Sequence, residues 1–252
     1  MTSVPPVGLL RFRGADAANF LQGQLSNDTT ALGGERLMLA GLHNPQGRVL
    51  ALLRLAALAS DHVVALLPAE LAETTMATLR RYVLRAKVTI SHDSSPASLA
   101  ELAAQLPAAA PALAATRRAA DIAAGLPQVY AATSGEFVAQ MLNLDCIGAI
   151  SFNKGCYTGQ EIIARAHYRG RMKRRMQRFV SNGPAALAPG QSITLGDGRS
   201  AQVVDAVTLD DGRSEFLAVA ALEVGPPAAA GDLRAAASLP VTPLPLPYAL
   251  PA

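Results

Sequence analysis

One stretch of the chain is the most informative about its fold: Phe152-Asn153-Lys154-Gly155-Cys156-Tyr157-Thr158-Gly159-Gln160-Glu161. Thr158 and Glu161 lie three residues apart just before an apolar pair, which is the spacing of a capping box, so a helix is expected to begin near Gly159. Cys156 then lies just ahead of the helix N-terminus. The unpaired amides there carry partial positive charge, and together with Lys154 they would favour the thiolate form of Cys156.

Two interpretations of this stretch stay open. In the functional one, Gly155 and Gly159 let a ligand approach the backbone closely, and Cys156 is a reactive thiol. In the structural one, the two glycines shape a tight turn and Cys156 is a small buried residue. Cys146, which lies in an apolar context, is expected in the core. A phosphate-binding P-loop is excluded because the spacing of glycines and lysine differs.

Residues 1–93 are predicted to form an α+β unit with a mostly antiparallel sheet. The pattern indicates a helix capped by Asp16 and a second helix over residues 69–84. Strands are expected over residues 37–42, 49–58, 62–67 and 87–91. Residues 94–118, rich in Ser, Pro and Ala, are a poorly packed helix or a linker or abbreviated second-domain segment, and we favour the linker.

Residues 119–180 are assigned to the remainder of the first region, with a helix over 136–142. Residues 181–252 differ, because strand-like runs over 192–195, 201–209 and 215–221 are divided by Gly-Asp-Gly and Asp-Asp-Gly turns. This spacing predicts a small antiparallel β-barrel, followed by an extended proline-rich tail.

Composition excludes several classes of protein. Half of the 252 residues are hydrophobic, but no run approaches the ~20 apolar residues of a membrane span. The first residues do not resemble a secretory signal, so we expect a cytoplasmic protein with no membrane partner. Two cysteines and four scattered histidines lack the spacing of metal ligands, and no metal site is expected.

The net charge of +3 depends on one basic window. Its members are Arg165, Arg169, Arg171, Lys173, Arg174, Arg175 and Arg178. Without them acidic residues outnumber basic ones. The window is suited to RNA phosphates, to the polyglutamate tail of a folate, or to nothing more than solvation of a helix end. Nucleic acid is not the expected partner, because no RNA-binding module accompanies the charge.

The octapeptide Lys154 to Glu161 resembles the signature of the YgfZ family of folate-binding proteins, which are relatives of the glycine-cleavage T-protein, an aminomethyltransferase. Further matching segments follow the family's order over most of the chain except residues 94–118. They are Gly14-Ala15-Asp16, Phe20 to Gln24, Asn27-Asp28, Gln46-Gly47-Arg48, Gly125-Leu126-Pro127, Tyr168-Arg169-Gly170, Lys173-Arg174 and Pro245 to Leu250.

This resemblance implies an α+β, T-protein-like folate-binding domain with a C-terminal antiparallel β-barrel. It also implies a protein that binds tetrahydrofolate or a derivative and supports the assembly or repair of iron–sulfur enzymes, including some that modify tRNA. Its partners would be reduced folate, iron–sulfur enzymes and cluster-assembly proteins. Cys156 matches the signature cysteine, and we expect a folate pocket between the first unit and the octapeptide. The expected folate-binding residues are Gln22, Asn27, Lys154, Gly155, Tyr157, Thr158, Gly159, Gln160, Glu161 and Arg169.

Two departures from the family pattern bear on activity. Relatives carry tryptophans near the folate, whereas this chain has none, and Val7 and Arg117 lie roughly at those places, so weaker binding is expected. The T-protein has acidic residues after the turn that matches Gly47, but residues 49–53 here carry no carboxylate. We therefore expect no aminomethyltransferase activity. A folate-dependent one-carbon transferase with an unidentified substrate remains the alternative.

Overall fold

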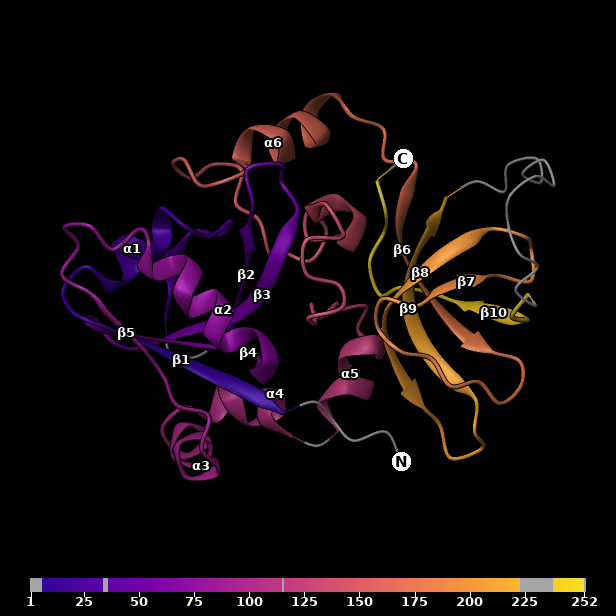
Figure 1. The fold of residues 1–252 in the computed structure, drawn as a ribbon, viewed down its shortest axis with the longest axis horizontal. Helices are drawn as coiled ribbons and strands as arrows, with labels where there is room; N and C mark the ends of the chain where they lie inside the picture. Colours follow the sequence, from indigo (N-terminus) through magenta and orange to yellow (C-terminus); the bar gives the residue numbers. More distant parts are fainter. Residues whose placement is uncertain (1–5, 34–35, 115, 223–237, 252) are drawn as a thin grey trace.

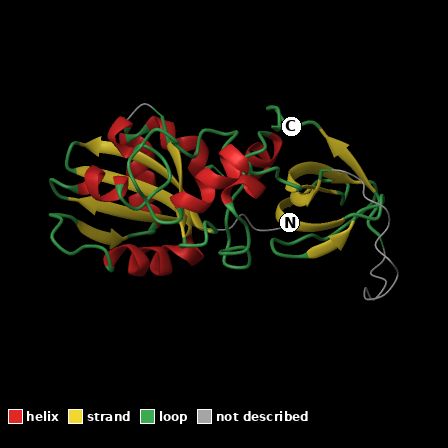
Figure 2. Ribbon diagram, turned by 90° about the horizontal axis from the view of Figure 1, so that it is seen from above, coloured by secondary structure: helices red, strands yellow, loops and turns green. Residues whose placement is uncertain are grey.

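A computed structural model describes residues 6–33, 36–114, 116–222 and 238–251. Two five-stranded antiparallel sheets lie at opposite ends of the molecule, with helices and loops between them (Figures 1 and 2). Within the described residues, no helix has the length and apolar character needed to cross a bilayer.

The first sheet has the strand order β2-β3-β4-β1-β5. Its strands are β1 (Val7–Arg13), β2 (Met38–His43), β3 (Val49–Ala59), β4 (His62–Pro68) and β5 (Thr89–His92). Side chains alternate between its faces, so Leu10 and Phe12 enter the main core, whereas Leu9 and Leu66 enter a second one. Helices α1 (Ala17–Gln22) and α2 (Ala69–Arg80) pack with the main core. The α+β prediction for this part is confirmed.

The second face of the sheet is covered by the segment for which we favoured a linker. That expectation is wrong for its structure: α3 (Pro96–Gln105) is capped by the hydroxyl of Ser95, and α4 (Ala110–Leu113) follows a 3₁₀ turn. Leu102 and Leu106 are buried against Leu9 and Leu66. The helical spacing of these leucines is obscured in the sequence by the surrounding alanines, which satisfy any pattern.

The middle of the chain is mostly loop. Helix α5 (Arg117–Ala123) ends at a turn with Gly125 at φ +65°. The helix expected over residues 136–142 is a shorter 3₁₀ turn, Ala139–Leu142, which ends at Asn143 in the left-handed conformation. Helix α6 (Gln160–Arg169) lies over the β2–β3 turn, where Gly47 faces Ile162 (Figure 1).

The second sheet has the strand order β10-β6-β9-β8-β7. Its strands are β6 (Arg174–Ser181), β7 (Ser192–Thr194), β8 (Ser200–Thr208), β9 (Ser214–Ala221) and β10 (Val241–Leu244). Both predicted hairpin turns are present, with Gly198 and Gly212 at positive φ. The two edges meet at one point, since Leu239 N donates to Thr194 O at 2.7 Å. The predicted barrel is therefore represented by a five-stranded antiparallel sheet with bridged edges.

Buried ionic contacts join the two halves of the molecule. Arg118 of α5 pairs with Asp205 of β8, and the Tyr130 hydroxyl donates to the same carboxylate at 3.0 Å. Burial raises the pKa of Asp205, and the Arg118 guanidinium opposes that effect. Since both members of the ion pair are nearly excluded from solvent, removing either would leave an uncompensated charge.

Candidate functional site

The side chain of Lys154 is a structural clamp. Its Nζ donates three hydrogen bonds to the carbonyl oxygens of Gln22, Leu25 and Asn27, at 2.6, 2.6 and 2.9 Å. Burial lowers the pKa of Lys154 to about 8, and Asp28 opposes that effect. An ammonium has three protons, so all of its donors are used. Lys154 therefore holds the segment after α1 and has no donor left for a ligand.

Gln22 and Asn27 are also engaged within the protein. The Gln22 amide donates to Asp28 Oδ1 at 3.0 Å and accepts from the Thr29 amide at 2.8 Å. The Asn27 amide donates to the carbonyls of Leu39 and Gly148, at 2.7 and 2.8 Å. These bonds fix the segment from Gln22 to Thr29 and link it to the loop before the octapeptide.

Helix α6 begins where the sequence predicts, but not by the predicted cap. Its N-cap is Gly159 at φ +83°, and no side chain caps the helix. The Glu161 carboxylate is exposed and lies 3.9 Å from Arg165. The expected cap of α1 is likewise absent, because the Asp16 carboxylate accepts from the Lys87 amide at 2.7 Å. In both places a contact with another part of the chain replaces the local one.

Replacing Gly159 with alanine is expected to destabilise the protein by about 2 kcal/mol, because a side chain would be forced into the left-handed conformation. Its Cβ would also lie 2.5 Å from the carbonyl oxygen of Asn44. Gly155→Ala is the matched control, since a Cβ there meets nothing within 4 Å. Urea unfolding of both variants measures the difference, and equal stabilities would contradict this geometry.

Cys156 is exposed, which excludes the interpretation of this residue as a small buried side chain. Two of the influences that we expected on its thiol are not in place. Lys154 is bonded elsewhere, and Cys156 lies four residues before the first residue of α6, whereas helix-terminal charge acts within about one turn. The thiol makes no hydrogen bond to any residue that the structure describes.

The next residue of the octapeptide is buried. Tyr157 is 7% exposed, and burial raises the pKa of its hydroxyl to about 12. Its ring lies 5.2 Å from Lys154 Nζ and 6.1 Å from the ring of His43. Its hydroxyl makes no hydrogen bond within the described residues, and neither do the side chains of Thr158, Gln160 and Arg169. These four side chains therefore keep free polar groups.

His43, beside Tyr157, is a buried histidine whose two ring nitrogens make no hydrogen bond in the described structure. Burial lowers the pKa of His43 to about 4. Neutral imidazole is therefore the form that the fold accommodates.

Stability should consequently fall on acidification. Because the folded pKa lies below the unfolded one, the unfolded state takes up the proton first, and stability that is complete above about pH 6.5 is lost toward pH 4. This linkage amounts to about 2 kcal/mol between pH 6.5 and 4.5. In unfolding measured at both pH values, His43→Gln should remove that loss. His92→Gln, at an exposed site, should retain it; identical pH profiles for the two variants would refute the assignment.

An open cavity of about 830 Å³ lies beside the segment that Lys154 holds. Its lining residues are Asn27, Ala31, Leu32, Gly33, Arg36, Leu37, Met38, Leu39, Ile147 and Gly148. Of the residues that we expected around a folate, Asn27 lines it, whereas Gln22, Tyr157 and Cys156 do not. The volume lies within the range of cavities that hold organic cofactors.

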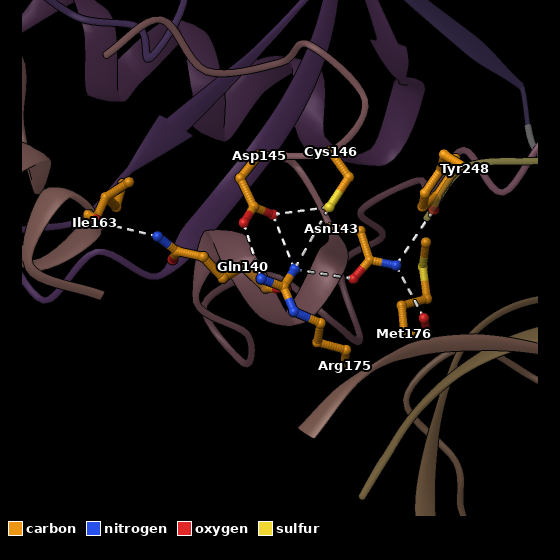
Figure 3. A network of polar contacts seen from close by, with 8 residues as sticks. All are labelled: Gln140, Asn143, Asp145, Cys146, Ile163, Arg175, Met176 and Tyr248. Atoms are coloured by element: carbon orange, nitrogen blue, oxygen red, sulfur yellow. Dashed lines mark hydrogen bonds and ion pairs between the residues drawn. The ribbon is translucent and has the colours of Figure 1, made fainter. Parts of the chain in front are cut away.

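A polar cluster that the sequence did not reveal lies where β6 meets the loops (Figure 3). The Arg175 guanidinium forms a two-pronged ion pair with the Asp145 carboxylate, at 3.0 and 2.9 Å, and both side chains are 4% exposed. It also donates to the carbonyl oxygen of Gln140 at 3.0 Å. Arg175 Nε and Gln140 Oε1 are buried without a described partner.

Cys146 belongs to this cluster rather than to the apolar core that we expected. Its sulfur lies 3.7 Å from Arg175 Nη1, and it is partly exposed (Figure 3). Burial and the neighbouring Asp145 raise the pKa of the Cys146 thiol to about 11. Its apolar neighbours in the sequence concealed this environment. No three His, Cys, Asp or Glu side chains are grouped as metal ligands among the described residues.

The fold is that of an aminomethyltransferase of the T-protein class. The glycine cleavage system aminomethyltransferase T from Bartonella henselae matches with a TM-score of 0.64, covering 87% of this chain and 77% of that chain, at 15% sequence identity. At this identity the likeness concerns the fold alone.

The sequence relatives are more specific. The chain is 29% identical over 270 residues to the tRNA-modifying protein YgfZ of Enterobacter sp. (strain 638), covering 84% of this chain and 82% of that protein. It is 43% identical over 97 residues to the tRNA-modifying protein YgfZ of Cronobacter sakazakii (strain ATCC BAA-894), covering 37% and 30%. No family model matches the chain. The resemblance to YgfZ and T-protein relatives is thus confirmed.

Proposed function

We propose that this protein binds a tetrahydrofolate and acts in the cytoplasm as an accessory to the assembly or repair of iron–sulfur enzymes, tRNA-modifying ones included. The observation that carries the proposal is the exposed, unbonded thiol of Cys156 in a chain whose relatives are tRNA-modifying YgfZ proteins. Such a thiol can react transiently with a persulfide or coordinate a cluster during transfer. Iron–sulfur enzymes and cluster-assembly proteins would be its partners.

The cavity beside Asn27 fits a folate in size and character. Most of its lining residues are apolar, and Arg36 supplies a cation that can pair with a glutamate carboxylate of the ligand. When bound, a reduced folate supplies a carrier of one-carbon units. The protein's part would be to hold the ring system against Leu32 and Met38. Lys154 and Gln22 would act indirectly, by fixing the wall that contains Asn27.

The alternative, a one-carbon transferase, lacks a visible base. Ala51 and Leu52 are fully buried in β3, at the place where we expect a carboxylate in the T-protein. Asp145, the nearest carboxylate of the polar cluster, is engaged by Arg175. General acid–base catalysis of amine transfer would need an unengaged group at the reacting atoms.

Calorimetric titration with tetrahydrofolate, folinate and an unrelated anion tests folate binding. Heat is expected with the reduced folates, and Arg36→Gln should weaken that binding. Arg213→Gln, which alters an exposed arginine paired with Asp211 on the second sheet, should not. Absence of heat with any reduced folate at millimolar concentration would refute the folate assignment.

Complementation tests the accessory role. Deleting the gene should lower the activity of iron–sulfur enzymes, and a Cys156→Ala copy should restore less activity than the wild type. Cys146→Ala is the matched control, because the raised pKa of Cys146 keeps that thiol protonated at neutral pH. Full complementation by Cys156→Ala would make the octapeptide architectural. Folate-dependent ammonia release from an aminomethylated carrier would instead establish the transferase.

A further inference from the structure

The structure divides the basic window into two sets with different roles. Arg174, Arg175 and Arg178 belong to β6 and are bonded within the protein, to the Val219 carbonyl, Asp145 and Glu215 respectively. Arg165, Arg169, Arg171 and Lys173 are exposed on α6 and the segment that follows it. The latter three make no side-chain contact with a described residue. Four cations are therefore available to an external anion.

Aromatic rings accompany these exposed cations. The ring of His167 stacks on Phe152, with centroids 3.8 Å apart and planes inclined by 17°. Tyr168 packs edge-on against His167 at 4.8 Å, and 68% of it is exposed. Phe152 comes from the loop before the octapeptide, so this ring cluster anchors the end of α6 and fixes the orientation of Tyr168. A preset, exposed ring is available for stacking.

The exposed side of α6 has a regular order. Ile162, Arg165, Tyr168 and Arg169 recur at the three- and four-residue spacing of one helix face. Glu161 is the single acid between residues 161 and 178, and its 3.9 Å contact with Arg165 is solvent-exposed and weak. Alternating cations and a ring along one line complement a chain of phosphates with a base between them.

We propose that this face of α6, with Arg171 and Lys173, binds single-stranded RNA, one base stacking on Tyr168 and flanking phosphates contacting the arginines. The inference extends the tRNA-related part of the proposed function and rests on it only for the choice of RNA over DNA. It requires neither folate binding nor the Cys156 thiol. It also reverses the expectation from the sequence, because the ring cluster is formed by residues fifteen positions apart and is invisible in the charge pattern.

A Tyr168→Trp variant tests the stacking directly, because the chain has no other tryptophan. With single-stranded oligouridylate RNA, its fluorescence should be quenched, whereas γ-polyglutamate should not quench it. Tyr82→Trp is the matched control: Tyr82 is 48% exposed beside Arg81 and Arg85, but no described ring contacts it. Its fluorescence should not change with either polymer.

Binding measured with labelled oligouridylate completes the test. Tyr168→Ala should weaken binding about tenfold, since base stacking on an aromatic ring is of that order. Replacing Arg165 and Arg169 with glutamine should lower the dependence of log K on log salt by about one unit. The inference is overturned if oligouridylate does not bind at low salt, if Tyr168→Ala binds as well as the wild type, or if γ-polyglutamate binds as tightly as RNA. None of these results alters the folate titration or the Cys156 complementation.

Discussion

An Arg175→Met variant is expected to lose about 3–5 kcal/mol of stability, because it leaves the Asp145 carboxylate buried without its partner. Arg175 also holds the Gln140 carbonyl, so the loss includes an unpaired backbone acceptor. The effect is large because both charges of the ion pair are almost fully excluded from solvent. Denaturant unfolding at neutral pH measures it.

Arg178→Met is the matched control, on the same strand. Its partner Glu215 lies at 2.8 Å, but the two side chains are 18% and 19% exposed, so a loss of about 1 kcal/mol is expected. Replacing Arg175 and Asp145 together with methionine and leucine should restore part of the stability. If Arg175→Met costs no more than Arg178→Met, the Arg175–Asp145 ion pair does not have the buried character that its geometry indicates.

The second large effect is expected at Lys154. Lys154→Met should cost about 3 kcal/mol, because three carbonyl oxygens lose a charged donor at once. Lys154→Arg should not restore the loss, since a planar guanidinium does not match three carbonyls that converge on one atom. Lys87→Met, at an exposed position, should change stability by less than about 0.5 kcal/mol.

The Lys154 variants also separate clamp from ligand. If Lys154 contacts a folate directly, Lys154→Met should abolish folate binding while unfolding stays unchanged. The described geometry predicts the reverse order, with loss of stability first and weaker binding only as a consequence. Thermal unfolding and calorimetry on the same sample distinguish these outcomes.

The sequence predicted well what depends on local pattern. The strands of the first sheet and the turns at Gly198 and Gly212 follow from alternation and turn chemistry within a few residues. The start of α6 was also predicted, although by a capping box that does not form. In an alanine-rich chain the same approach failed for α3, whose apolar face is defined by the sheet it covers.

The site was less predictable, because its bonds join distant residues. The carbonyl partners of Lys154 lie 127 to 132 positions earlier in the chain, and only the fold shows that they meet its ammonium. Arg175 was placed in a solvated basic window, and Cys146 in the core, yet the two approach within 3.7 Å. Neither charge nor hydropathy encodes which cation of a cluster turns inward.

The contacts of Tyr248 imply an order of assembly during synthesis. Its hydroxyl donates to the carbonyl of Gly125 at 2.7 Å and accepts from Asn143, residues 123 and 105 positions earlier (Figure 3). The first sheet can form once residue 92 has left the ribosome, but the junction around Asn143 must wait for residue 248. The nascent chain therefore exposes the Arg175 cluster until its last stretch emerges, and this interval is when a chaperone would be needed most.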